Sequence, residues 1–183
     1  MPLFTVGHSD RSIEEFIDLL AAHEVGVLAD VRSLPGSRKF PHFNSEALAT
    51  SLPERGIEYL RIEDLGGRRN KSKTVDPSAN GMWRNQSFHN YADWAMGEDF
   101  GRALQQFRAL GPRRPTVMCS EAVWWRCHRR IIADHLLALG DDVRHIMSPT
   151  KADPATLTPG AQTDGATVTY PAEDPPSGDD FSG

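Results

Sequence analysis

Short apolar runs alternate with stretches of helical periodicity along most of this chain. Apolar residues of the intervening stretches recur every three or four positions, as in amphipathic helices. The runs, rich in β-branched residues, predict buried strands at residues 3–6, 27–31, 57–60, 115–119 and 143–147. Strands and helices in this alternation predict an α/β fold: a single three-layer domain with a mostly parallel sheet of about five strands.

Local signals place the connecting helices. Ser12 and Glu15 have the spacing of a capping box at a helix start. A long helix is expected from about 122 to 139, directly after the fourth strand, and two earlier helical stretches are expected to carry Tyr91, Trp94, Phe100, Leu104 and Phe107. The segment 64–87 lacks periodicity, and a loop of that length is uncommon unless it is functional.

The C-terminal segment differs in composition from the rest. Residues 148–183 hold six of the 13 prolines and have an acidic balance without apolar periodicity. Such a composition buries too little apolar surface to offset the entropy lost on ordering. We therefore expect a domain over 1–147 and an acidic, Pro/Thr-rich tail over 148–183, disordered or docked.

Charge and composition narrow the class of protein. From Lys151 onward lie one of the 20 basic and six of the 25 acidic residues, which leaves residues 1–150 with 19 of each sign and no net charge. No signal peptide or membrane span is recognisable, and two cysteines are too few for a disulfide framework. We expect a soluble, cytoplasmic protein that does not associate with membranes; its oligomeric state is left open.

Polar residues follow four of the predicted strands. Parallel α/β sheets bind ligands at the carboxyl ends of their strands, so these residues are expected to share one edge. The groups are His8-Ser9-Asp10; Asp30, Arg32, Ser33 and Arg38; Asp64-Leu65-Gly66-Gly67-Arg68; and Cys119-Ser120-Glu121.

Four groups of motifs occur along the predicted domain. They are Thr5-Val6-Gly7-His8-Ser9, Asp30-Val31-Arg32-Ser33 with Pro35 and Ser37-Arg38, Gly56-Ile57 before Leu65-Gly66-Gly67, and Cys119-Ser120-Glu121 before Cys127-His128-Arg129. In this combination the chain resembles the bacterial and archaeal domain-of-unknown-function 488 family. The resemblance spans about residues 3–147 and implies no established reaction.

Cys119 is the candidate nucleophile. Directly before a helix capped by Ser120, its thiol would be acidified by the helix dipole; the alternative is a small buried core residue. Two known cysteine loops fit poorly. Cysteine phosphatases have an arginine six positions after the nucleophilic cysteine, whereas the residue six positions after Cys119 is Trp125. Rhodanese-like sulfurtransferases share only the Asp-x-Arg motif at Asp30.

The chain also contains residues suited to proton transfer and residues of the types that bind metals. His8, Glu121 and Asp30 are candidate general acids or bases, unless the carboxylates pair with Arg32. Metal ligand types are present, but the eight-residue spacing of the cysteines differs from that of structural zinc sites. The sequence thus indicates no metal and no cofactor.

Basic and glycine residues suggest an anionic substrate. A basic side chain at a strand end, such as Arg32, is suited to bind phosphate or carboxylate. Arg129 and Arg130, on the last long helix, are expected to be solvated surface charges, and His128 to be a core histidine or a substrate contact. Candidate substrate-binding residues are Arg32, Ser33, Arg38, Gly66, Gly67, Arg68, Ser120 and His128.

Two functional hypotheses remain. In the first, the chain is an enzyme or ligand-binding protein for an anionic substrate, such as a phosphorylated molecule, a nucleotide or a nucleic acid, with a thiol in its site. In the second, it is a nucleic-acid-binding or regulatory module without catalysis, which uses the basic 64–87 loop. Whether it is an enzyme is undecided by the sequence.

Overall fold

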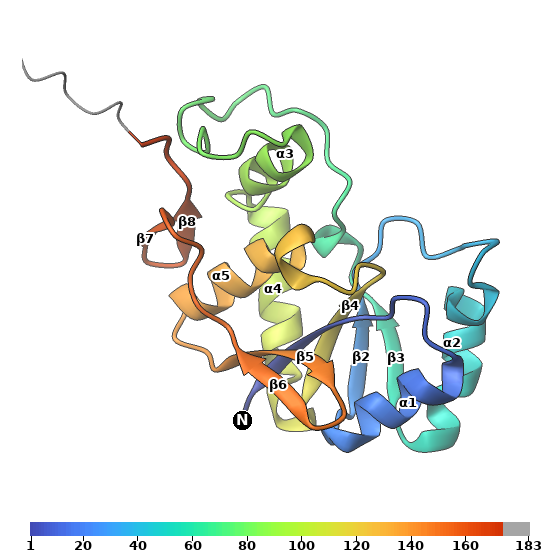
Figure 1. Ribbon diagram of the computed structural model, residues 1–183. Helices are drawn as coiled ribbons and strands as arrows, with labels where there is room; N and C mark the ends of the chain where they lie inside the picture. The colour runs from blue at the N-terminus through green and yellow to red at the C-terminus, as the bar shows by residue number, and fades with distance from the viewer. Residues whose placement is uncertain (174–183) are drawn as a thin grey trace, which may run out of the picture.

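The computed structural model describes residues 1–173 and contains a mixed α/β fold around one six-stranded sheet (Figure 1). The strand order is β3-β2-β4-β1-β5-β6; the first five strands are parallel, and β6 is antiparallel to β5. The strands are β1 (Leu3–Gly7), β2 (Val27–Asp30), β3 (Glu58–Arg61), β4 (Pro115–Cys119), β5 (Val143–Ser148) and β6 (Lys151–Pro154). The mostly parallel sheet predicted from the sequence is confirmed, with one antiparallel strand added.

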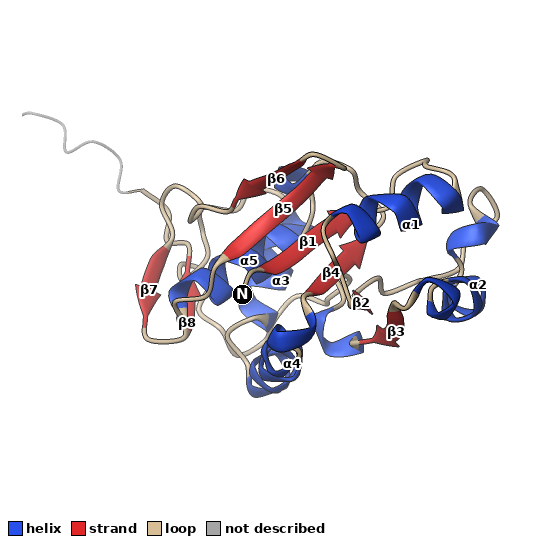
Figure 2. Cartoon of the chain, turned by 90° about the horizontal axis from the view of Figure 1, so that it is seen from below, coloured by secondary structure: helices blue, strands red, loops and turns tan. Residues whose placement is uncertain are grey.

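Helices cover both faces of the sheet (Figure 2). On one face, Phe16 and Leu20 of α1 and Leu48 of α2 pack against Leu28 and Met118 of the strands. On the other face, the three remaining helices pack against β1, β2, β4 and β5 in a second apolar core. The helices are α1 (Ile13–Ala22), α2 (Ser45–Ser51), α3 (Gln86–Trp94), α4 (Glu98–Ala109) and α5 (Arg129–Ala138).

Local sequence signals explain where two of the helices begin. The predicted capping box at α1 is present: Ser12 Oγ accepts from the Glu15 backbone N–H, and the Ser12 N–H donates to the Glu15 carboxylate. Asn85 caps α3 in the same manner, accepting from two backbone N–H groups. Within residues 1–173, no helix is both long enough and apolar enough to cross a membrane.

The helix after β4 begins later than predicted. Instead of starting near residue 122, the chain forms a loop and a 3₁₀ turn over Trp124–Arg126, and α5 starts at Arg129. Glu121 Oε1 accepts from the Val123 N–H, and Trp124 stacks on His145 at a ring distance of 4.4 Å. These contacts favour a bend over a helical continuation at this point.

Much of the expected tail packs on the domain. After β6, the hairpin of β7 (Gln162–Asp164) and β8 (Thr167–Thr169) leads to Tyr170, which is fully buried. Tyr170 donates from its hydroxyl to Asp134 over 2.7 Å, and its N–H donates to Asn80. The part of the expected tail up to residue 173 is therefore docked, and the rest, 174–183, lies outside the described residues.

Candidate functional site

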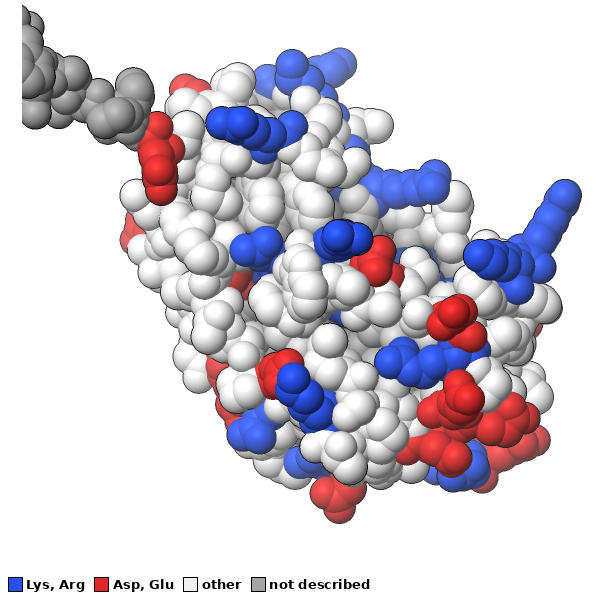
Figure 3. Space-filling view, in the orientation of Figure 1, with Lys and Arg blue, Asp and Glu red and all other residues white. Residues whose placement is uncertain are grey.

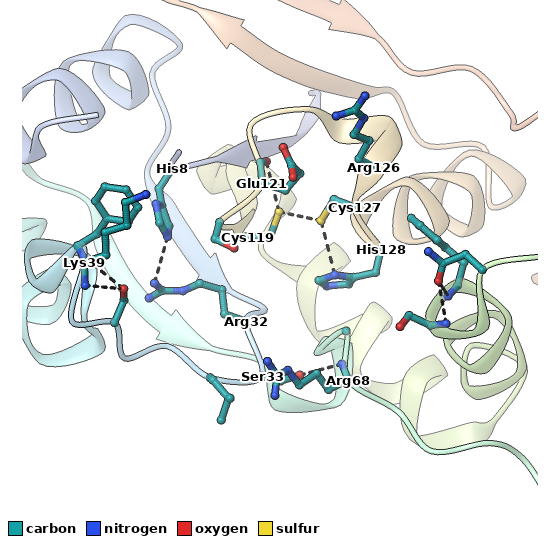
Figure 4. Close-up of a pocket in the computed structure, with 18 residues that line it drawn as sticks. His8, Arg32, Ser33, Lys39, Arg68, Cys119, Glu121, Arg126, Cys127 and His128 are labelled. Carbon is teal, nitrogen blue, oxygen red and sulfur yellow. Dashed lines mark hydrogen bonds between the residues drawn. The ribbon is translucent and has the colours of Figure 1, made fainter. Parts of the chain in front are cut away.

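A cavity of about 580 Å³ opens at the carboxyl edge of the sheet. Its walls come from the loops after β1, β2 and β4 and from the start and end of the 64–87 loop (Figure 4). Nine of the twelve candidate residues line it: His8, Arg32, Ser33, Gly67, Arg68, Cys119, Ser120, Glu121 and His128. The four strand ends therefore meet in one place, although their chemical roles remain predictions.

The other three candidates lie off the cavity. Asp30 is fully buried and holds Arg32. Arg38 is exposed on the loop after β2, and Gly66 forms a turn in which its N–H donates to Glu63. None of these side chains or backbone groups is among those that line the cavity.

Two sulfur atoms lie in contact on the cavity wall. Cys119 Sγ is 2.8 Å from Cys127 Sγ, and Arg129 Nη1 donates to Cys119 Sγ over 3.3 Å. Cys127 Sγ also lies 3.6 Å from His128 Nδ1 (Figure 4). A chain of polarisable groups thus runs from Arg129 through both thiols to an imidazole.

These contacts affect the pKa values of the two thiols in opposite directions. Burial opposes ionisation of Cys119, but the hydrogen bond from Cys127, the charge of Arg129 and the contact near Glu121 outweigh it and lower the pKa to about 7. Burial and the same hydrogen bond raise the pKa of Cys127 well above its ordinary value. Near neutral pH, about half of the Cys119 population is therefore thiolate, and Cys127 is the thiol that donates to it.

The acidifying groups differ from those expected. α5 begins ten residues after Cys119, so Ser120 does not cap a helix there and the predicted helix-dipole effect is wrong for this thiol. The prediction that Arg129 is a solvated surface charge is also wrong, because its side chain is 1% exposed. Its neighbour Arg130 is partly buried and donates to Thr158.

Two glycines permit the close packing around the sulfurs. A Cβ on Gly7 would lie 1.8 Å from the Glu121 carbonyl oxygen and 2.6 Å from Arg129 Nη1. A Cβ on Gly67 would lie 2.5 Å from His128 Nδ1. Any side chain at either position would displace the groups that contact the thiols, which gives a physical reason for glycine in both motifs.

Asp30, Arg32 and His8 form a second buried network. The Asp30 carboxylate accepts from Arg32 Nε and Nη2 at 2.9 and 2.8 Å and also from the Tyr59 hydroxyl. Arg32 Nη1 points to His8 Nε2 at 3.3 Å, and His8 Nδ1 lies 2.7 Å from the Ser9 carbonyl. Burial lowers the pKa of His8 to about 4, so near pH 7 the ring is neutral, donates through Nδ1 and accepts from Arg32.

The rim of the cavity carries an apolar patch and three exposed basic side chains, of which only Arg68 was a candidate from the sequence. Lys39, Arg68 and Arg126 are exposed and form no ion pair within residues 1–173, whereas Glu121 is the one carboxylate among the lining residues. The apolar patch consists of Leu34, Phe40 and Phe88. Lys39 follows the second predicted strand and Arg126 falls within the predicted helix from about 122 to 139, so neither was a candidate site residue.

The described residues contain no group of three or more His, Cys, Asp or Glu side chains arranged to hold a metal ion.

Comparison with known proteins identifies the family. The model described as "Domain of unknown function DUF488" matches residues 12–136. The chain belongs to this family. The DUF488 match runs from the start of α1 into α5 and includes both cysteines and Arg129, while His8 lies just before it. No curated protein and no solved structure gives a significant match.

Proposed function

We propose that this DUF488 domain binds a phosphorylated small molecule of nucleotide size, and that the Cys119 thiolate is the group that reacts with it. The observation that carries this proposal is the combination, in one cavity, of exposed cations, an apolar wall and an acidic thiol. Each feature alone is common on protein surfaces, but together they suit a ligand with an anionic end and a flat or apolar body.

The charge around the cavity supports an anionic ligand. Because Asp30 already neutralises Arg32, the cations that remain to meet a ligand are Lys39, Arg68 and Arg126, against Glu121 alone. Figure 3 shows Lys and Arg side chains over the upper part of the molecule, while acidic side chains gather near α1 and α2. Phosphate oxygens accept from such side chains in charge-assisted hydrogen bonds.

The size and lining of the cavity support a ligand larger than phosphate. A volume of about 580 Å³ falls in the range of sites for small organic molecules. Phe40 and Phe88 offer aromatic surface, and Ser33, Ser87 and Asn85 offer hydroxyl and amide groups that would orient polar atoms of the ligand.

Calorimetric titration tests this proposal directly. Adenosine 5′-monophosphate is expected to bind at least tenfold more tightly than adenosine, and pyrophosphate to compete with it. Arg68→Ala and Arg126→Ala should each weaken binding by about tenfold, since a hydrogen bond to a charged group contributes roughly 1.5–3 kcal/mol. Lys73→Ala, an equal charge change on an exposed loop residue that does not line the cavity, should leave the affinity unchanged.

Two outcomes would overturn the proposal. One is that neither the nucleotide nor pyrophosphate binds at millimolar concentration. The other is that Lys73→Ala weakens binding as much as Arg68→Ala does, because general surface charge rather than the cavity would then hold the ligand.

The second candidate function, nucleic-acid binding through the 64–87 loop, rests on the exposure of Lys71, Lys73 and Arg84. Arg69 is not available to such a surface: its guanidinium donates to two backbone carbonyls and lies 4.0 Å from the Trp94 ring centre. Fluorescence anisotropy with single-stranded DNA over a salt series would show steep salt dependence, lost in the triple alanine variant of the three exposed residues. Arg69→Ala would instead damage the fold and is a poor test.

A further inference from the structure

The two sulfur atoms on the cavity wall have different hydrogen-bond partners, a difference that two cysteines with a purely structural role would not require. Both line the cavity, although Cys119 is only 3% and Cys127 only 6% exposed. They lie 2.8 Å apart, and one of them also receives a hydrogen bond from a buried arginine. One sulfur is thus prepared to attack a small molecule, and the other is in position to react with the product.

We propose that Cys119 and Cys127 are a redox-active dithiol that reduces a hydroperoxide and closes into an intramolecular disulfide. This activity goes beyond ligand binding and needs no bound nucleotide. Cys119 is the attacking sulfur, because Arg129 Nη1 donates to it, and Cys127 is the resolving sulfur, because its contacts are a second sulfur and the neutral ring of His128.

The first step oxidises Cys119. Its thiolate attacks one oxygen of the hydroperoxide, the O–O bond breaks, and a sulfenic acid forms on the sulfur. The departing hydroxide or alkoxide takes up the proton that the Cys119 thiol released on ionisation, giving water or an alcohol. The peroxide is reduced by two electrons, and Cys119 is oxidised by two.

The second step resolves the sulfenic acid. Cys127 Sγ attacks Cys119 Sγ, an S–S bond forms, and the S–O bond breaks. The departing hydroxide carries away the Cys127 proton as water, so the dithiol and one peroxide molecule yield a disulfide, one water from this step, and one water or alcohol from the first step. A dithiol reductant would regenerate the starting state by thiol–disulfide exchange.

Geometry favours the second step over further oxidation. A sulfenic acid that meets no thiol is oxidised to sulfinic acid, whereas one next to a thiol condenses to a disulfide. The loop over residues 120–128, which is not helical except for one 3₁₀ turn, returns the chain so that residue 127 contacts residue 119. The buried side chain of Arg129 fixes the loop further by donating to the Ala122 carbonyl.

Oxidation of the full chain tests the proposal. The reduced protein is treated with one equivalent of hydrogen peroxide, then alkylated with N-ethylmaleimide, and its intact mass is measured without reductant. We expect both thiols to disappear together, the mass to fall by two hydrogens, the protein to remain monomeric in this reaction, and dithiothreitol to restore both thiols.

Variants assign the two roles. In Cys127→Ser the sulfenic acid should persist on Cys119 and be trapped by dimedone at that residue. In Cys119→Ser the remaining Cys127 thiol should react with peroxide at least tenfold more slowly than Cys119 does, since its burial raises the pKa and disfavours the thiolate. Circular dichroism of each variant identifies a loss of fold, and the wild-type measurement decides the main point without any variant.

Three results would overturn the inference: a wild-type protein whose Cys127 stays alkylatable after Cys119 reacts, one that forms only intermolecular disulfides, or one whose thiols react no faster than those of the urea-unfolded chain. The nucleotide titration is carried out on the reduced protein in a separate experiment. Disulfide formation without nucleotide binding would therefore contradict the proposed function alone, and the reverse result would contradict the dithiol alone.

Discussion

The acidity of Cys119 offers the sharpest test of how the site is organised. With a pKa of about 7 instead of 9.0, half of the Cys119 thiol is ionised at pH 7. An ordinary thiol with the higher pKa would be only about 1% ionised at that pH. The thiolate population is thus roughly 50-fold larger than in an unperturbed cysteine, a difference that alkylation kinetics resolve easily.

The perturbation is the removal of the Arg129 charge in Arg129→Met. Its Nη1 lies 3.3 Å from Cys119 Sγ, and an opposite charge this close typically changes a pKa by one to three units. Removing a positive charge disfavours the thiolate, so the pKa should rise by about that amount. At pH 7, where Cys119 is half ionised in the wild type, the rate of alkylation should fall by roughly fivefold or more.

The assay is the rate of iodoacetamide modification of Cys119 between pH 5.5 and 10, followed by mass spectrometry of the peptide. Arg130→Met is the matched control, because Arg130 is partly buried and donates to Thr158 rather than to sulfur. A wild-type midpoint near pH 9 would refute the reasoning. So would equal shifts in the two arginine variants, which would indicate general loosening of α5 instead of a specific charge contact.

Three further predictions concern stability and packing. Burial lowers the pKa of His135 to about 4, so below pH 6.5 the unfolded chain binds the proton more readily than the folded one. The contribution of His135 to the free energy of unfolding should therefore decrease as the pH falls, by about 2 kcal/mol at pH 5. His135→Phe should reduce this pH dependence in urea unfolding. Asn80→Ala removes the 2.7 Å hydrogen bond to buried Asp93 and should cost about 2–3 kcal/mol in the same assay, with an unchanged value contradicting the role of Asn80 as an anchor of the 64–87 loop. Gly67→Ala should displace the His128 ring and alter its NMR chemical shifts, whereas Gly36→Ala, whose Cβ meets no atom within 4 Å, should not.

The sheet could be predicted because its signals are local. The bounds of each predicted strand lie within one or two residues of those of an observed strand. Short apolar runs rich in β-branched residues between turn residues form buried strands more often than other structures. β6, the antiparallel edge strand Lys151–Pro154, was missed because Lys, Ala, Asp and Pro are all depleted in strands and none of these four side chains is buried. The burial of Tyr170 was missed because its partners Asn80 and Asp134 lie far away in the sequence.

The gathering of candidate residues at one cavity could be predicted, because parallel strands bring their carboxyl ends to one edge, and nine of the twelve line that cavity. The roles of the charged residues could not. Arg129 looked solvated because it lies beside Arg130 in a polar stretch, and nothing local reveals that it turns inward to a sulfur 3.3 Å away. Lys39 and Arg126 were not among the candidates, because their approach to the cavity depends on the course of two loops.

The wrongly predicted helix start is the feature on which the chemistry depends. A helix begun at Ala122 would rise about 1.5 Å per residue and carry Cys127 roughly 7.5 Å along its axis, away from the strand end where Cys119 lies. The observed bend instead brings the two sulfur atoms to 2.8 Å, and it fits because Gly7 has no Cβ to collide with the Glu121 carbonyl 1.8 Å away. An alanine at Gly7 would therefore affect the thiol pair through the loop rather than through β1. The separation of eight residues that excludes a zinc motif is thus compatible with a dithiol once the chain between the cysteines is a loop.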